Sequence, residues 1–126
     1  FWGLRMDAMR ALPYSMAALM AGVGAFGMLG LAPRITALHV VVTFLAFGAG
    51  WSWPVFTNFG IMRANGDAAG AASGVTQMGI YLGVFLGPLL TGWTIDEFGY
   101  SWMWAVVATF MAIGAAITYA VREEFA

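Results

Sequence analysis

Four long apolar stretches, separated by short charged clusters, constrain this chain more than any other feature. Each stretch reaches the roughly 20 residues that a helix needs to cross the hydrocarbon core of a bilayer. We expect them to cover approximately residues 11–32, 37–59, 69–93 and 101–121. Apolar residues run through them continuously, whereas strands of a membrane β-barrel would alternate apolar and polar positions. The sequence therefore predicts an all-α membrane protein with four transmembrane helices.

The composition and the connections support this interpretation. Of the 126 residues, 62% are hydrophobic and only 9% are charged, whereas soluble domains average about 25% charged residues. The connections are short, as in "PRIT" at 33–36, so consecutive helices are expected to lie antiparallel to one another. The net charge is -1 and the chain has no lysine, which leaves no basic patch for nucleic acid.

Several kinds of chemistry lack the residues that they need. The chain has no cysteine, which excludes disulfides and thiolate chemistry. The sequence shows no cluster of metal ligands and no nucleophile with a histidine base, so we predict no enzyme activity, catalytic residue, cofactor or metal site. No charged residue lies near the middle of a stretch, so these residues alone supply no carboxylate carrier for protons across the membrane.

Arginines near the ends of the stretches predict the orientation of the chain. One side of the predicted membrane holds four of them: Arg5, Arg10, Arg63 and Arg122. The other side holds Arg34 alone, beside Asp96 and Glu97. Because arginines gather on the cytoplasmic side, both ends of the chain are expected in the cytoplasm.

The second stretch contains "GAGWSWPVFTNFG" at 48–60 and is expected to have a polar, aromatic face. At 100° per residue, one arc of the helix collects these residues: His39, Thr43, Ala46, Gly50, Trp53, Pro54 and Thr57, with Trp51 and Asn58 at its edge. Pro54 removes the backbone bond to the carbonyl of Gly50, so a kink is expected there. We interpret this face as a cavity wall that can bend, with Trp51, Trp53, Thr57 and Asn58 as candidate substrate contacts. Alternatively, the tryptophans anchor the helix at the membrane interface and the hydroxyl groups bond locally.

The third stretch is expected to have one helix face made of glycines, which lack side chains, and an adjacent polar face. Gly79, Gly83 and Gly87 recur at every fourth position, which predicts a close helix crossing in lipid. A separate polar stripe contains Ser73, Gln77, Val84, Pro88 and Thr91, with Tyr81 near its flank. Gln77 is expected to bond either to another helix or to substrate, because a glutamine that faces lipid would be costly. We expect the first and fourth stretches to be supporting helices.

Three segments resemble the closing third of a Major Facilitator Superfamily transporter. In "FWGLR", Gly3 and Arg5 match the tail of the family's cytoplasmic loop motif Asp-Arg-x-Gly-Arg-Arg, whereas Phe1 and Leu4 depart from it. Residues 63–102 are similar to the family's charged loop, its Gly/Ala/Ser-rich eleventh helix with a Gly-Pro pair, and a Gly-x-x-x-Asp-x-x-Gly turn. That turn is Gly92, Asp96 and Gly99. The second stretch resembles the tenth helix, which lines the central cavity and bends during gating.

The resemblance implies that residues 1–126 form the last four helices of a twelve-helix fold with two six-helix bundles. The second helix would then face a substrate site between the bundles, and the third would pack against the first bundle. The implied activity is secondary active transport of a small organic solute by alternating access. Aromatic and neutral polar side chains suit a solute that is uncharged or weakly anionic.

The same resemblance implies the partners and the location. The partners would be the lipid bilayer, the preceding helices of the same protein and a small-molecule substrate, and the location a plasma (inner) membrane. The first residue is Phe, which leads us to expect that the chain begins within a longer protein. Helices three to six of the first half fit less well, because the family's fourth helix often carries an arginine that the second stretch lacks. The main alternative is a small four-helix membrane protein that acts through assembly, with the glycine stripes as its interfaces.

Overall fold

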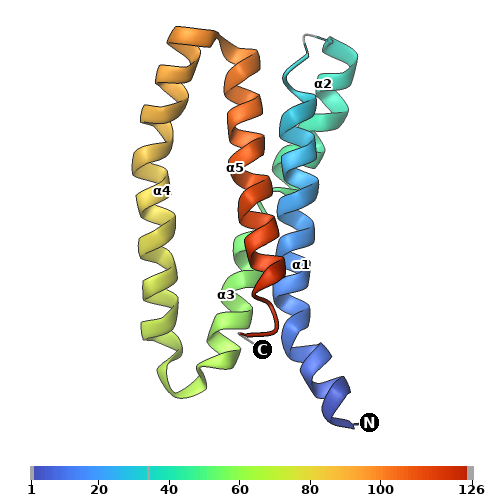
Figure 1. The fold of residues 1–126 in the computed structure, drawn as a ribbon, viewed down its shortest axis with the longest axis vertical. Coiled ribbons are helices and arrows are strands. Elements are labelled where there is room, and N and C mark those ends of the chain that lie inside the picture. Colours follow the sequence, from blue (N-terminus) through green and yellow to red (C-terminus); the bar gives the residue numbers. More distant parts are fainter. Residues whose placement is uncertain (1, 34, 125–126) are drawn as a thin grey trace.

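A computed structural model describes residues 2–33 and 35–124, with side chains from residue 11 onward. No strand occurs in these ranges. Four helical segments within them are long and apolar enough to cross a membrane: Ala11–Gly30, Thr36–Ala64, Gly66–Phe98 and Tyr100–Ala120. They run alternately up and down (Figure 1), joined by short turns. The structure therefore confirms an all-α fold with four antiparallel membrane helices.

Helix α1 (Trp2–Gly30) is the helix around which most of the others pack. It contacts α5 (Tyr100–Ala120), α3 (Trp53–Ala64) and the segment that precedes α3, whereas α4 (Ala69–Phe98) packs on α3 and α5. Within its most apolar window 50% of the residues are buried, compared with 6% in the segment that contains α4. Small side chains make this packing possible, because Ala17, Ala21 and Ala25 are all buried.

The second segment is interrupted rather than continuous. It consists of α2 (Thr36–Thr43), a π-helical stretch η1 (Phe44–Ala49), a turn at 50–52, and α3. In the interruption the N–H of Gly50 donates to the carbonyl of Leu45 (3.2 Å), and that of Ser52 to the carbonyl of Ala49 (3.0 Å). Pro54 lies in the first turn of α3, where its missing N–H costs nothing. The expected kink at Pro54 is thus part of a longer break that begins at Phe44.

The closest helix approach brings α1 against this break. A Cβ added at Gly24 would collide with the Cα of Gly50, and one at Gly27 would collide with the backbone of Ala46. Ala46 is completely buried, with 0% of its surface exposed. Farther along, a Cβ at Gly60 of α3 would lie 2.9 Å from the ring of Tyr14. Glycines therefore do permit a close crossing, but the pair that uses them is α1 with η1 and α3.

Helix α4 follows a short 3-10 turn η2 (Gly66–Ala68) and runs as one helix to Phe98. The Gly92–Asp96–Gly99 motif was expected to form a turn, but Gly92 and Asp96 belong to the helix. Only Gly99 has a positive φ, of 87°, and its N–H ends the helix by donating to the carbonyl of Ile95 (2.9 Å). A left-handed backbone needs glycine at one position only, so the rest of the motif stays helical.

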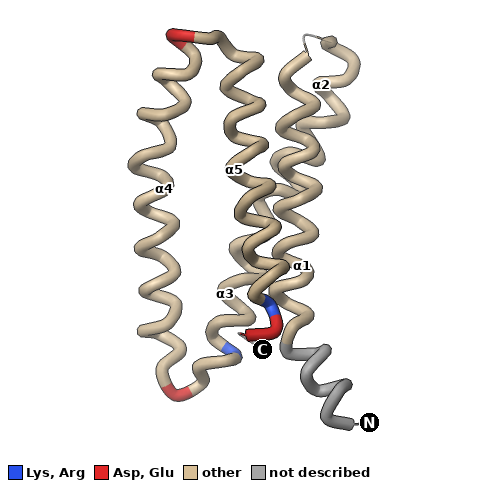
Figure 2. Tube along the Cα trace, in the orientation of Figure 1, with Lys and Arg blue, Asp and Glu red and all other residues tan. Residues whose placement is uncertain are grey.

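Charged residues lie toward the two ends of the helices, as the coloured positions along the chain in Figure 2 show. Arg63 and Arg122 share one end, whereas Asp96 and Glu97 lie at the other. This distribution matches the two sides expected for these residues. Arg34 and the side chains of Arg5 and Arg10 lie outside the part of the chain that the structure describes.

Candidate functional site

The two tryptophans proposed as substrate contacts point to different surroundings. Trp53 lines a cavity of about 320 Å³ between α1, α3 and α5, together with Ala17, Ala21 and Thr118. Trp51 is 73% exposed, with its ring 6.4 Å from that of Phe47. Counting 100° per residue assumed an unbroken α-helix, and the π-helical stretch changes that phase. The expected single arc is therefore divided in the folded chain.

Part of that arc packs against α1 instead of lining a cavity. Ala46 and Gly50 are both buried there, in the close crossing with Gly27 and Gly24. Gly50 thus contributes a bare backbone surface to a helix contact. Pro54 is half-buried one turn later, at the start of α3. The structure therefore places these two bending candidates directly at the break in the second segment.

Two hydroxyl groups of the second segment, those of Ser52 and Thr57, bond locally. Thr57 donates its Oγ1 hydrogen to the carbonyl of Trp53 (3.0 Å), and Ser52 donates to the carbonyl of Gly48 (2.7 Å). The alternative interpretation of these hydroxyls is thus confirmed. The oxygen of Thr57 keeps its capacity to accept one further hydrogen bond.

Asn58 differs from the other polar residues in having an unpaired buried atom. Within the described residues, its Oδ1 is buried without a hydrogen-bond partner. A buried carbonyl oxygen without a donor costs about 1–3 kcal/mol. A hydrogen-bond donor from outside these helices would remove that cost, which makes Asn58 a candidate contact.

The candidates on α4 lie on an open surface. Gln77 is half-buried, and Tyr81 is 68% exposed. A Cβ added at Gly79, Gly83 or Gly87 would meet nothing within 4 Å, and Pro88 is exposed. None of these α4 residues lines the cavity beside Trp53. The structure therefore does not bring the α3 and α4 candidates into one closed site within the described chain.

Two features escaped the sequence interpretation, and both involve α5. Thr118 and Gly114 of α5 line the cavity beside Trp53, although we expected this helix to give support only. Near its end, the guanidinium of Arg122 stacks on the ring of Tyr119, 3.8 Å from the centroid. The threonine and glycine within an apolar helix were the available signal. Gly3 and Arg5, the expected remnant of the loop motif, lie among the residues whose side chains are not described.

Four apolar helices joined by short turns define the chain as a polytopic helical membrane protein. In the ranges that the structure describes, no group of three or more His, Cys, Asp or Glu side chains could hold a metal ion. A family model of the Major Facilitator Superfamily matches residues 1–126, so the chain belongs to this superfamily of membrane transporters. No curated protein and no solved structure matches the chain.

Proposed function

We propose that this chain forms the last four helices of a secondary transporter that moves a small organic solute by alternating access. Membership of the superfamily supports the transporter class. The similarity of residues 63–102 to the eleventh helix and its flanking loops supports the position within the fold. A small protein that acts only through helix assembly is not favoured by a family match over the whole chain.

The observation that carries this proposal is the break in the second segment, followed by the unpaired oxygen of Asn58. Substrate sites in transporters of this kind form where transmembrane helices are discontinuous, because freed backbone groups line a cavity there. Single π-helical turns are likewise frequent at functional sites. In the chain, η1 and the turn at 50–52 interrupt the helix, and Asn58 follows within two turns.

The chemistry of Asn58 defines the kind of solute. Its Oδ1 requires a donor, so the solute carries an N–H or O–H group. The indoles of Trp51 and Trp53 offer flat apolar surfaces, and no charged side chain within the described helices demands a counter-charge near them. An uncharged or weakly anionic molecule with hydroxyl or amide groups fits these features best.

The open surface of α4 is the proposed contact with the preceding helices of the same protein. Gly79, Gly83 and Gly87 would let a helix of the first bundle approach closely, and Gln77 and Tyr81 would border the cavity. Gly50 and Pro54 would allow the second segment to bend as the bundles rock. We place both chain ends in the cytoplasm and the protein in the plasma (inner) membrane, with lipid as its solvent and no nucleic-acid partner or cofactor.

Uptake by the whole protein in proteoliposomes tests the role of Asn58. A panel of radiolabelled sugars, amino acids and small carboxylates first identifies a transported solute. Asn58→Leu, which is of similar size but has no acceptor, is then expected to lower kcat/KM about tenfold or more. Without solute, the melting temperature of Asn58→Leu should equal or exceed that of wild type, because the substitution removes an unpaired buried oxygen. Asn58→Asp keeps the acceptor and should retain more transport than Asn58→Leu.

A matched control is Thr109→Val on α5, whose hydroxyl bonds locally to the carbonyl of Ala105 (2.8 Å) on an exposed face. This variant should transport normally. Equal transport by wild type and Asn58→Leu would show that Asn58 does not contact the solute. If no solute of the panel accumulates in proteoliposomes above its level in protein-free vesicles, that result would count against the transporter proposal itself.

A further inference from the structure

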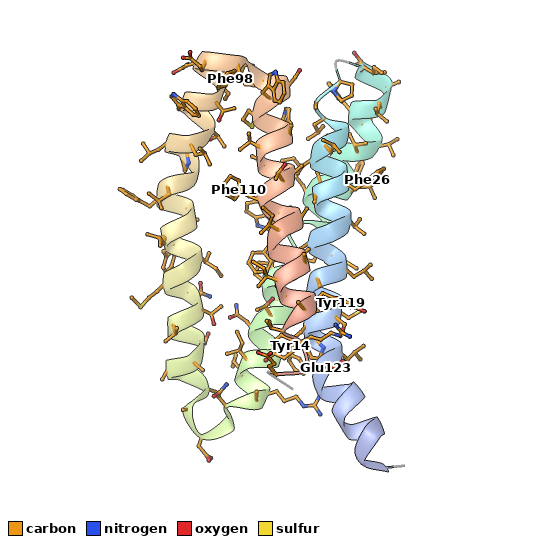
Figure 3. The ribbon with its side chains drawn as sticks, viewed as in Figure 1. Tyr14, Phe26, Phe98, Phe110, Tyr119 and Glu123 are labelled. Atoms are coloured by element: carbon orange, nitrogen blue, oxygen red, sulfur yellow. The ribbon has the colours of Figure 1, made fainter. Side chains whose placement is uncertain are left out.

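A groove runs along the outer side of the α1–α5 pair. Its volume is about 560 Å³, and its lining is apolar apart from Ser15 and Tyr119. Gly22 and the small residues Ala18 and Ala115 leave room along it, because a Cβ added at Gly22 would meet nothing within 4 Å. Phe26 lies toward one end of the groove and Tyr119 toward the other, as Figure 3 shows.

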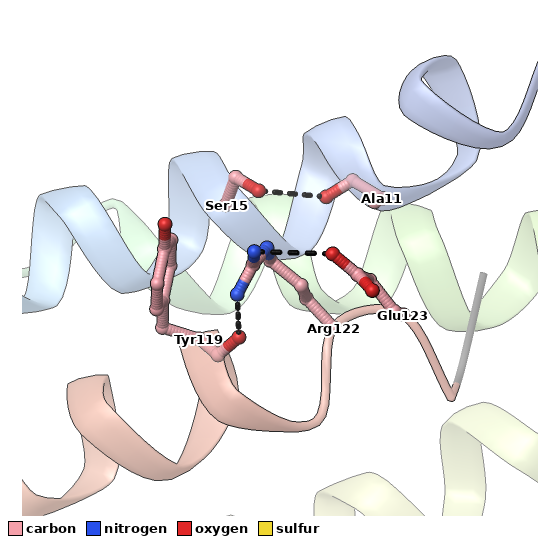
Figure 4. A network of polar contacts seen from close by, with 5 residues as sticks. All are labelled: Ala11, Ser15, Tyr119, Arg122 and Glu123. Carbon is pink, nitrogen blue, oxygen red and sulfur yellow. Dashed lines mark hydrogen bonds and ion pairs between the residues drawn. The ribbon is translucent and has the colours of Figure 1, made fainter. Parts of the chain in front are cut away.

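The length of the groove matches an acyl chain in one leaflet. Its α1 side extends from Ser15 to Phe26, which at 1.5 Å per residue is roughly 16 Å. The hydrocarbon core of a bilayer is about 30 Å thick, so one leaflet contributes about 15 Å. The Tyr119 end (Figure 3) lies at a charged end of the helices (Figure 2), and Arg122 lies beside Tyr119 (Figure 4). A lipid tail can therefore fill the groove from the membrane surface to the midplane.

An ion pair between Arg122 and Glu123 lies at the Tyr119 end of this groove. Figure 4 shows the guanidinium of Arg122 between the ring of Tyr119 and the carboxylate of Glu123, opposite Ser15 of α1. One of its Nη atoms donates to the carbonyl of Tyr119, and the other to Oε1 of Glu123 (3.1 Å). These contacts fix the side chain while leaving further N–H groups of the guanidinium for a ligand, since arginine has five donors.

The Arg122–Glu123 pair matches a zwitterion better than an anion. An arginine binds a phosphate through charge-assisted, often bidentate hydrogen bonds. Glu123 is 78% exposed beside it, and its carboxylate would repel a purely anionic headgroup. A primary ammonium one short linker away from the phosphate would instead donate to that carboxylate. A quaternary ammonium has no N–H group and could not.

We propose that the α1–α5 groove binds one phospholipid of the phosphatidylethanolamine class, with an acyl chain along Gly22 and its headgroup on Arg122 and Glu123. The phosphate bonds to Arg122, the ammonium bonds to Glu123, and the tail covers the bare surface of α1. This lipid acts as a fixed part of the structure on the supporting side of the bundle. The proposal uses the membrane fold and the groove, and it does not depend on which solute is transported.

Native mass spectrometry of the whole protein tests the proposal, because it counts bound lipids without measuring transport. The protein is extracted from vesicles that contain equal parts of dioleoyl phosphatidylethanolamine, phosphatidylcholine and phosphatidylglycerol. Phosphatidylethanolamine is expected to remain bound preferentially to wild type. Arg122→Gln should lower its occupancy about tenfold, the loss expected from one charge-assisted hydrogen bond. Glu123→Gln should abolish the preference over phosphatidylcholine.

Gly22→Leu supplies an independent test, because its side chain enters the groove from a Cβ with nothing within 4 Å and leaves both charges in place. It should also lower occupancy about tenfold, from the lost burial of several methylene groups. Gly70→Leu on α4 is the matched control, since a Cβ there also meets nothing within 4 Å, and it should leave occupancy unchanged. Equal retention of the three lipids by wild type, or unchanged occupancy in Gly22→Leu, would overturn the proposal.

Discussion

The close crossing of α1 with the interrupted segment gives the sharpest stability prediction. In Gly27→Ala, the new Cβ would lie 2.8 Å from the Cα of Ala46 and 3.0 Å from the carbonyl carbon of Leu45. Both atoms belong to the backbone of a buried segment, so no side chain can turn away to make room. The two helices must separate by several tenths of an ångström, and overpacking of this kind costs about 1–3 kcal/mol.

Gly22→Ala on the same helix isolates that cost. Both substitutions gain about 1 kcal/mol of helix propensity relative to glycine, but the new methyl group at residue 22 meets nothing within 4 Å. The difference between the two free energies of unfolding should therefore be about 1–3 kcal/mol, with Gly27→Ala the less stable variant. Denaturation of the whole protein by sodium dodecyl sulfate, followed by tryptophan fluorescence, measures both values. Equal stability of the two variants would refute the close approach of α1 to Ala46.

Two further predictions concern α4 and its end. Gly83→Leu should reduce transport by the whole protein at least tenfold, about the effect of losing one close helix contact. The control variant Gly70→Leu should transport normally. Normal uptake by Gly83→Leu in proteoliposomes would argue against a helix crossing at Gly79, Gly83 and Gly87. Gly99→Ala should lower the free energy of unfolding by about 1–3 kcal/mol, because φ 87° with ψ 174° is a backbone region reserved for glycine. Gly92→Ala, inside the helix and without close neighbours, should be neutral or stabilising in the same titration, and equal stability of the two variants would contradict the strain at Gly99.

The sequence was sufficient to predict the four helices and their antiparallel order. Hydrophobicity and bilayer thickness act on each segment separately, so the helix count needs no knowledge of the partners. The region expected to depart from a regular helix also contains the observed break, since Gly48, Gly50 and Pro54 weaken a helix by their own chemistry. The length of the break was not predictable, because its π-helical stretch lies against α1 and depends on that contact.

The partner of each glycine surface could not be read from spacing. The regular repeat at 79, 83 and 87 suggested the closest crossing, yet that surface is open in the described chain. The glycines at the observed crossing, Gly24 and Gly27, lie on α1, a glycine-rich helix expected to pack as a support. Spacing shows which side of a helix is bare, whereas the identity of the neighbour depends on the whole fold. Similarly, only the three-dimensional structure shows that the oxygen of Asn58 is buried without a donor.

The turn between α4 and α5 has a consequence for how the protein enters the membrane. Gly99 alone separates the two helices, since α4 ends at Phe98 and α5 begins at Tyr100. So short a connection leaves almost no slack between the two helices, and we expect them to insert together as a single hairpin. That hairpin carries Asp96 and Glu97 at its tip, and an acidic side chain at the membrane centre costs roughly 3 kcal/mol on insertion scales. The apolar composition of its two arms provides the opposing driving force, which means that biogenesis sets an upper limit on how polar these arms can become.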